Sequence, residues 1–346
     1  MRHLIPVYLA AACGGAAFAA LGMPLPWMMG PLLVSAMLSL TGLLDRTLPV
    51  VTRPFGQAVV ASQVGLSFTP QAVATVLAMS PLLVGLAAMT ALYSLGVAVL
   101  QARLARARLS RMVLATFPIS PVEAAVLAEQ CDIPPAPVIM AQTLRIAAIV
   151  TVLPILIYWL DGWPQGGRPL PGAIGGAAAP GLAGLAAAAA AGGLLFRRLG
   201  WANPYFLGPL ALSSALTAAG TPLSSYPPLV LATAQVVLGA WLGSTFRPGI
   251  FREAGREMAV SVAGTLLLLA LSCASAAGIA GWLGLDWETA VLAVAPGGVT
   301  EMSLAARFLA QDVALVTAAH LVRIFLFMPL ARPLVRLVHR RERAGP

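Results

Sequence analysis

The chain has 346 residues, of which 59% are hydrophobic and 10% charged, and its mean hydropathy is +0.89. This composition excludes a pair of ordinary soluble domains and predicts a protein that crosses a membrane several times. The net charge is +9 and all 21 basic residues are arginine, but the arginines stand in short clusters between apolar stretches. Such clusters are typical of cytoplasmic loops, so we expect a lipid bilayer as partner and no direct contact with nucleic acid.

Twelve apolar stretches, six in each half, are candidates for helices in the membrane. In chain order they cover 4–20, 26–44, 54–69, 77–101, 112–130, 135–160, 172–196, 204–220, 228–246, 258–283, 289–309 and 313–335. Several are rich in Gly and Pro and barely reach the ~20 residues that a span requires. Residues 2–20 could also be read as a cleaved signal peptide. Because an internal stretch matches them, we expect them to remain as the first helix.

The second half of the chain repeats the first at a constant spacing of 178 residues, without a gap. The matched pairs include Gly22/Gly200, Pro26/Pro204, Gly30/Gly208, Pro31/Pro209, Gln57/Gln235, Gly65/Gly243, Pro118/Pro296, Glu123/Glu301 and Arg145/Arg323. Hydrophobic composition alone does not produce matches at Gly, Pro and charged residues. We predict an internal duplication, with repeat 1 at 1–168 and repeat 2 at 169–346, interlocked as one structural unit.

One matched pair of stretches, 112–130 and 289–309, is interrupted in its first half. The interruptions are Pro118 to Pro121 and Pro296-Gly297-Gly298. A helix does not run smoothly through such residues. We therefore predict two broken or re-entrant helical elements, one in each repeat.

The arginines indicate how the halves face. If all six stretches of each half crossed, Arg197-Arg198 and the loop from Arg247 to Arg256 would lie outside, against the positive-inside rule. If five cross and the broken element returns or otherwise does not cross, every arginine cluster is inside and 20–25, 67–71, 161–168, 221–228 and 284–288 are outside. We predict an all-α polytopic membrane protein of two inverted repeats, with about ten transmembrane helices and with both termini cytoplasmic.

Inverted repeats with discontinuous helices are the usual architecture of secondary transporters, whose substrate site lies near the midplane at the broken elements. Irregular backbone at that depth is tolerated only where protein buries it or where it lines a cavity. The predicted substrate- or ion-binding residues are Ser120, Glu123, Gln142 and Arg145 in the first half, and Pro296, Gly297, Gly298, Thr300, Glu301, His320 and Arg323 in the second.

Glu123 and Glu301 come just after the breaks, at matched positions. A carboxylate at membrane depth is expensive unless paired or protonated, which makes a duplicated one a functional candidate. Ser120-Pro121-Val122-Glu123 is also a capping box with Pro at the first helical position, and Gly298 can cap the helix of Glu301. Both roles stay open.

Arg145 and Arg323 each follow a polar residue by three positions, Gln142 and His320, so each pair shares a helical face. The arginines either neutralise the two glutamates or reach toward an interface, or they bind an anionic group. His320 is either a packed polar residue or a proton relay.

Outside the breaks, small and polar residues predict helix contacts. Gly30-Pro31 and Gly208-Pro209 indicate close packing or a kink, and Asn203 with Gln57 and Gln235 indicates hydrogen bonds between helices. We find no Walker motif, metal-ligand cluster, nucleophile elbow or paired-carboxylate pattern, and the three cysteines form no CxxC pair. We expect no enzyme activity, no cofactor and no metal.

Two motifs resemble a known family. Gly22-x-Pro-x-Pro26 leads into Trp27-Met-Met-Gly-Pro31, and Ala295-Pro-Gly-Gly-Val-Thr-Glu-Met302 is followed by His320-Leu-Val-Arg323. Together with the duplication, they resemble the AbrB-type bacterial inner-membrane family over essentially the whole chain. The resemblance implies a fold grouped with cation/proton antiporters and anion-transporter-like proteins. The first repeat departs from the motif, with Ile119-Ser120-Pro121 where Pro-Gly-Gly is expected, so the site is expected mainly in the second half.

Members of that family are labelled regulators of gene expression or "ammonia monooxygenase". The chain has no DNA-binding motif, so any regulation would be indirect. His3, His320 and His339 cannot form one copper site, since two lie beyond the apolar core at opposite ends of the chain. Three hypotheses follow: a transporter of a small solute or ion, anionic solutes included; a membrane regulator or sensor without transport; and an enzyme, which no specific motif supports. Whether the chain forms a homo-oligomer is open.

Overall fold

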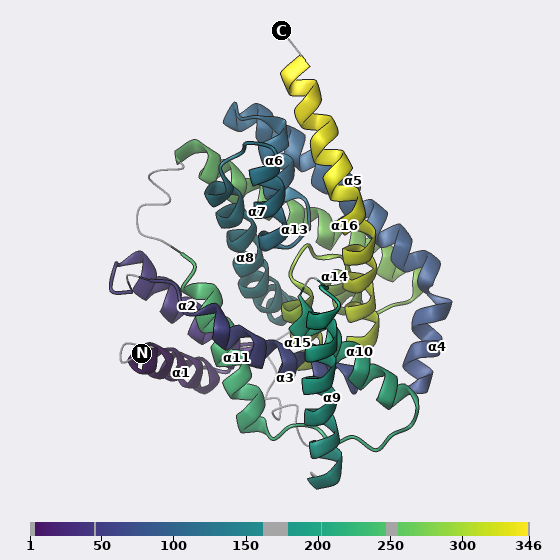
Figure 1. Cartoon of the computed structure of the whole chain (residues 1–346). Helices are drawn as coiled ribbons and strands as arrows, with labels where there is room; N and C mark the ends of the chain where they lie inside the picture. The colour runs from purple at the N-terminus through teal and green to yellow at the C-terminus, as the bar shows by residue number, and fades with distance from the viewer. Residues whose placement is uncertain (1–3, 45, 162–178, 202, 247–254, 345–346) are drawn as a thin grey trace. The chain divides into compact units, whose positions relative to one another are not determined.

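The computed structural model describes residues 4–44, 46–161, 179–201, 203–246 and 255–344, and no strand occurs among them (Figure 1). The first half contains α1 (Leu4–Ala20), α2 (Pro26–Leu40), a 3-10 turn η1 (Val50–Thr52), α3 (Arg53–Gly65), α4 (Pro70–Ala78), α5 (Ser80–Ala105), α6 (Leu109–Thr116), α7 (Pro121–Gln130) and α8 (Pro135–Asp161). The second half contains α9 (Ala179–Arg198), α10 (Pro204–Ala218), α11 (Pro228–Gly243), α13 (Gly255–Leu283), α14 (Trp287–Val294), α15 (Val299–Phe308) and α16 (Val313–Ala344). Residues 162–168 of the predicted loop at 161–168, most of the loop from Arg247 to Arg256 and the start of the stretch 172–196 lie outside the described residues.

The duplication is visible in the helix bounds. Moving α2, α6 and α7 by the spacing of the repeat gives the bounds of α10, α14 and α15. Left-handed backbone recurs as well: Leu25 matches Asn203, Arg106 matches Gly284, and Asp132 matches Ala310, all with positive φ. This conformation is strained for most side chains. Its survival where the residue type has changed shows that the two halves keep one backbone plan.

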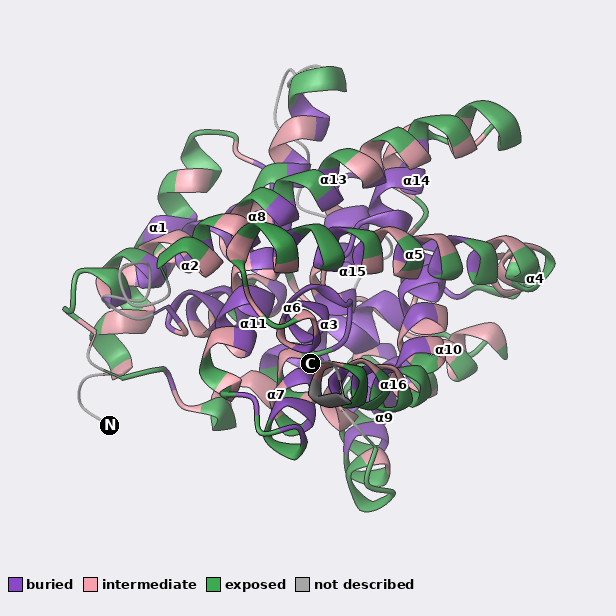
Figure 2. Cartoon of the chain, turned by 90° about the horizontal axis from the view of Figure 1, so that it is seen from above, coloured by how far each residue is buried: buried purple, intermediate pink, exposed green. Residues whose placement is uncertain are grey.

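Five described helices are long and apolar enough to cross a membrane: α5, α8, α9, α13 and α16. Three shorter apolar helices, α1, α2 and α11, accompany them. These helices make the chain an integral membrane protein with several spans. Figure 2 shows that buried and exposed residues alternate along α5, whereas α4, a short helix that the sequence did not predict, has no buried residue.

Both predicted breaks are confirmed. The stretch 112–130 divides into α6 and α7, and 289–309 divides into α14 and α15. Phe117 (φ −63°, ψ 135°) and the matched Ala295 (φ −53°, ψ 134°) turn the chain to extended backbone where α6 and α14 end.

The chain forms two compact units, and each takes elements from both repeats. The first comprises residues 1–79, 154–247 and 300–315, and the second comprises the rest. In the first unit, α2 packs on α1 and α11, and its match α10 packs on α9 and α3. A Cβ atom at Gly30 would lie 2.4 Å from the carbonyl oxygen of Gly14, and one at Gly208 would lie 2.1 Å from that of Gly192. The predicted close packing at the two Gly-Pro pairs is therefore confirmed.

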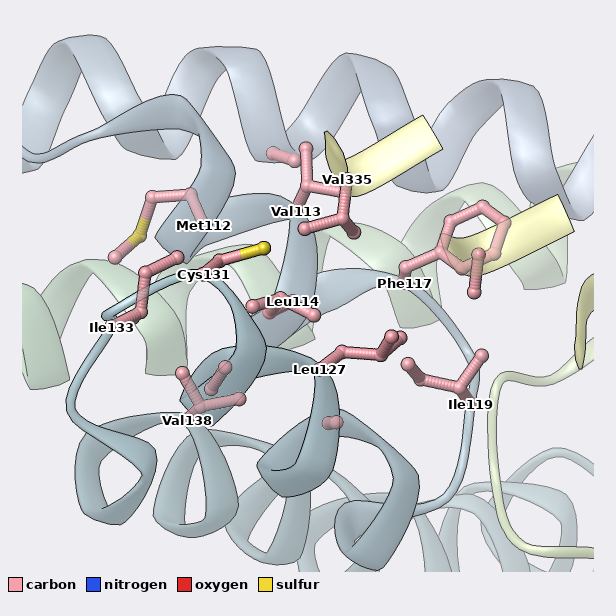
Figure 3. Packing of buried hydrophobic residues seen from close by; sticks show 14 of the residues in the cluster. Met112, Val113, Leu114, Phe117, Ile119, Leu127, Cys131, Ile133, Val138 and Val335 are labelled. Carbon is pink, nitrogen blue, oxygen red and sulfur yellow. The ribbon is translucent and has the colours of Figure 1, made fainter. Parts of the chain in front are cut away.

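The second unit has its apolar core around the first break. Met112 and Leu114 of α6, Phe117 of the break and Leu127 of α7 belong to this buried cluster (Figure 3). The ring of Phe117 packs on Phe327 of α16, with centroids 4.9 Å apart. Apolar packing thus holds the broken segment in place from one side.

Candidate functional site

The break in the first repeat is held by two side chains of α8. Arg145 Nη1 donates to the carbonyl oxygens of Thr116 (2.6 Å) and Phe117 (3.4 Å), and Nη2 donates to Gln142 Oε1 (2.5 Å). Gln142 Nε2 donates in turn to Leu114 O (2.6 Å) and Phe117 O (3.0 Å). The last carbonyls of α6 have no partner within their own helix, and these side chains satisfy them.

The break in the second repeat is held in the same way from α16. Arg323 Nη1 donates to Ala295 O (2.8 Å), and Nη2 donates to Gly297 O (2.8 Å) and to His320 Nδ1 (2.5 Å). His320 Nε2 lies 2.9 Å from Leu292 O, the residue that matches Leu114. The predicted pairing of each arginine with the polar residue three positions earlier is confirmed in both repeats.

These contacts assign the protons of His320. Nδ1 faces a guanidinium and must accept, while Nε2 faces a carbonyl and must donate, so the imidazole is neutral in this arrangement. In the first repeat, the amide of Gln142 accepts from Arg145 and donates to the carbonyl of Leu114 in the same way. This is the geometry of a packed polar residue, the first of the two roles that the sequence left open.

The two guanidiniums are buried, with 3% of Arg145 and 4% of Arg323 exposed. In the described part of the chain neither forms an ion pair, and each keeps an Nε–H without a hydrogen-bond partner. The two charges also repel each other. The negative ends of the α6 and α14 dipoles, each equivalent to roughly half a charge, offset part of this cost. The arginines therefore do not neutralise the two glutamates by direct pairing; they bind backbone carbonyls where α6 and α14 end.

Glu123 lies in the first turn of α7, where its backbone N–H donates to Ser120 Oγ (3.2 Å). Ser120 is thus the N-cap that the capping box predicts. The carboxylate of Glu123 interacts electrostatically with Arg332. Its position in the first turn supports the helix-end role, and this position is also compatible with a role in binding.

Glu301 lies in the first turn of α15, which begins directly after Pro296, Gly297 and Gly298; the neighbouring Thr300 is buried. Its carboxylate interacts electrostatically with Arg53 at the start of α3.

The guanidinium of Arg53 lies over the ring of Trp241, 4.4 Å from the centroid. Sequence reasoning missed Arg53 as a site residue and placed it in a cytoplasmic loop. One sequence signal could have singled out Arg53: the matched residue of the second repeat, Leu231, carries no charge, so this arginine is not part of the repeat pattern.

The predicted amide contact between helices is confirmed for one of the two matched glutamines. Gln57 donates to Asn203 Oδ1. Gln235 forms no hydrogen bond with a described residue. No group of three metal-ligating side chains occurs within the described ranges.

The matched broken helices, each bound by a buried arginine, and the long apolar helices together indicate a duplicated, helical integral membrane protein. The chain belongs to the family described as Transition state regulatory protein AbrB, whose model matches residues 2–161 and again 122–339. The resemblance inferred from the sequence motifs is confirmed.

The chain is also similar to the uncharacterized protein YhjN of Bacillus subtilis (strain 168), with 34% identity over 105 residues. That match covers 30% of this chain and 27% of the relative. No solved structure gives a significant match.

Proposed function

We propose that this protein is a secondary transporter of a small solute in a bacterial inner membrane. The observation that carries the proposal is the pair of helix breaks at matched positions, each of which binds a buried arginine. Arg145 donates to the carbonyls of Thr116 and Phe117, and Arg323 donates to those of Ala295 and Gly297. Broken helices in repeated halves supply the ion and substrate sites of secondary transporters. Burying two unpaired guanidiniums is costly, and a scaffold could use continuous helices instead.

We infer further that the repeats are inverted. The long apolar helices α5 and α9 both end in arginine, Arg103 in one and Arg197 with Arg198 in the other. Between these two ends the chain passes through the α6–α7 pair, α8 and α9. Both arginine ends reach the cytoplasm only if the broken pair makes no net crossing, which gives each repeat an odd number of spans and turns the second one over.

Cysteine accessibility tests this topology. In a protein whose three native cysteines are replaced, we expect Trp282→Cys, at the end of α13, to react with a membrane-impermeant maleimide in intact cells. Arg108→Cys and Leu199→Cys are expected to react only after permeabilisation. All three side chains are exposed, so accessibility reports the side of the membrane. Reaction of Leu199→Cys from outside would restore parallel halves.

The glutamates are the proposed transport residues, and Glu301 is expected to matter more because its break keeps the double glycine. A metabolite-library thermal-shift screen on the purified protein identifies a solute, and proteoliposomes then measure its flux. We expect Glu301→Gln to lower that flux at least about tenfold, equivalent to about 1.4 kcal/mol, and Glu123→Gln to lower it less.

Wild-type flux in both variants would leave the two carboxylates as helix caps. Binding of the solute without any flux would instead favour a membrane sensor that affects gene expression indirectly, the competing function that the family's description raises.

A further inference from the structure

A partly open pocket in the first unit is lined by residues of α2, α3, α11 and α15. Its walls are mainly apolar, with Leu25, Trp27, Val60 and Phe308 among them. The polar groups are few: Gln63, Gln235 and Arg307. Apolar walls with a small number of polar groups are typical of small-molecule sites.

The duplication shows that this pocket is a departure from the repeat plan. At the place that the duplication relates to this pocket, Gln57 of repeat 1 donates to Asn203 of repeat 2. The matched pair on the pocket is Gln235 with Leu25, and a leucine side chain offers no acceptor. The amide of Gln235 therefore lines the pocket without a hydrogen bond to a described residue.

The space itself has a related origin. At that related place Trp241 stacks under Arg53, whereas the pocket has the matched Gln63 and Leu231, which are smaller and do not stack. Gln63 is also bound elsewhere: its Nε2 donates to Ser225 Oγ (2.9 Å), and its Oε1 accepts from Tyr226 N (3.0 Å). The wall is thus fixed, and the pocket leaves open the volume that an indole and a guanidinium fill at the related place.

The pocket lies along the same helix faces as the charged pair of the first unit. Leu304 and Phe308 follow Glu301 by three and seven residues and share its face of α15. On α3, Val60 and Val64 follow Arg53 on one face in the same manner. The Glu301 carboxylate and the Arg53 guanidinium therefore belong to the two helix faces that continue into the pocket.

We infer that this pocket is a solute-binding site for a small monocarboxylate with an apolar body, with Arg307 and Gln235 holding the carboxylate. The inference rests on the proposed transport function and names its substrate class. A guanidinium and an amide N–H are the donors that a carboxylate requires, and charge-assisted hydrogen bonds are about twice as strong as neutral ones. Leu25, Trp27 and Phe308 would enclose the apolar part.

Binding measurements on the purified full-length protein test the inference. Benzoate and isovalerate are the probes, and benzamide is the neutral match of benzoate. We expect both carboxylates to bind saturably by calorimetry and to raise the melting temperature. Benzamide is expected to bind at least about tenfold more weakly, because it lacks the charge that Arg307 pairs with.

Four variants locate the binding. Arg307→Gln removes the charge, Gln235→Leu replaces the amide with an apolar side chain, and Ala232→Leu fills the pocket. Thr233→Leu places the same leucine at an exposed neighbouring position on α11. We expect Arg307→Gln and Ala232→Leu to weaken benzoate binding about tenfold or more, Gln235→Leu about threefold or more, and Thr233→Leu to leave it unchanged.

Failure of both carboxylates to bind, or benzoate binding that Ala232→Leu does not weaken, overturns the inference. The proposed function fails separately. If benzoate binds through these residues but proteoliposomes show no flux, the site stands and transport does not. If another solute is transported and these variants leave its flux unchanged, transport stands and this site does not.

Discussion

Arg323→Ala is expected to destabilise the protein by about 3 kcal/mol or more, because the change leaves the carbonyls of Ala295 and Gly297 and the Nδ1 atom of His320 without their donor. Each buried group left unpaired costs about 1–3 kcal/mol. Insertion into the membrane should persist, since α16 stays apolar over its length. Thermal unfolding of the detergent-solubilised protein measures the loss, and Arg145→Ala should behave alike.

His320→Gln is the matched control. A glutamine already occupies the equivalent position of the first repeat, where it accepts from an arginine and donates to a helix-end carbonyl. We expect the free energy of unfolding of this variant to lie within about 1 kcal/mol of the wild-type value. His320→Leu can neither accept nor donate a hydrogen bond there, and it should melt at a lower temperature. If Arg323→Ala melted like the wild type, the arginine would not be holding the break, and its role would lie in binding an anionic group.

Gly30→Ala is expected to separate α1 from α2 and to prevent normal folding of the first unit. The added Cβ atom would lie 2.4 Å from the oxygen and 2.5 Å from the carbon of the Gly14 carbonyl, and main-chain atoms cannot rotate away as a side chain can. Overpacking of this kind costs about 1–3 kcal/mol or more. Gly208→Ala, which meets Gly192 at 2.1 Å, should have an effect of the same size.

Gly85→Ala is the control for that experiment, because a Cβ atom there meets nothing within 4 Å. It lies inside α5, where alanine favours the helix by up to about 1 kcal/mol over glycine. Melting temperatures and the yield of monodisperse protein should therefore fall for Gly30→Ala and Gly208→Ala but not for Gly85→Ala. Equal melting temperatures and yields for all three variants would show that α1 and α2, and likewise α9 and α10, do not pack so closely.

Much of the plan of this protein can be derived from its residues alone. The spacing of the repeat, the break at Pro296 to Gly298 and the pairing of His320 with Arg323 are local or periodic features. Proline and glycine act on their own backbone, and residues three apart on a helix meet whatever surrounds them. For the same reason the capping role of Ser120 was predicted and is confirmed.

Other features were decided only when the helices packed. The donors of Arg145 reach the carbonyls of Thr116 and Phe117, not the carboxylates that the sequence offered as partners. The charge opposite Glu301 comes from Arg53, and the pocket beside Gln235 lies where Gln63 and Leu231 stand in place of the matched Trp241 and Arg53. Contacts of this kind join residues far apart in the chain, and they depend on which face each helix turns to its neighbour. Composition and period constrain that choice weakly in a membrane protein, where nearly every helix face is apolar.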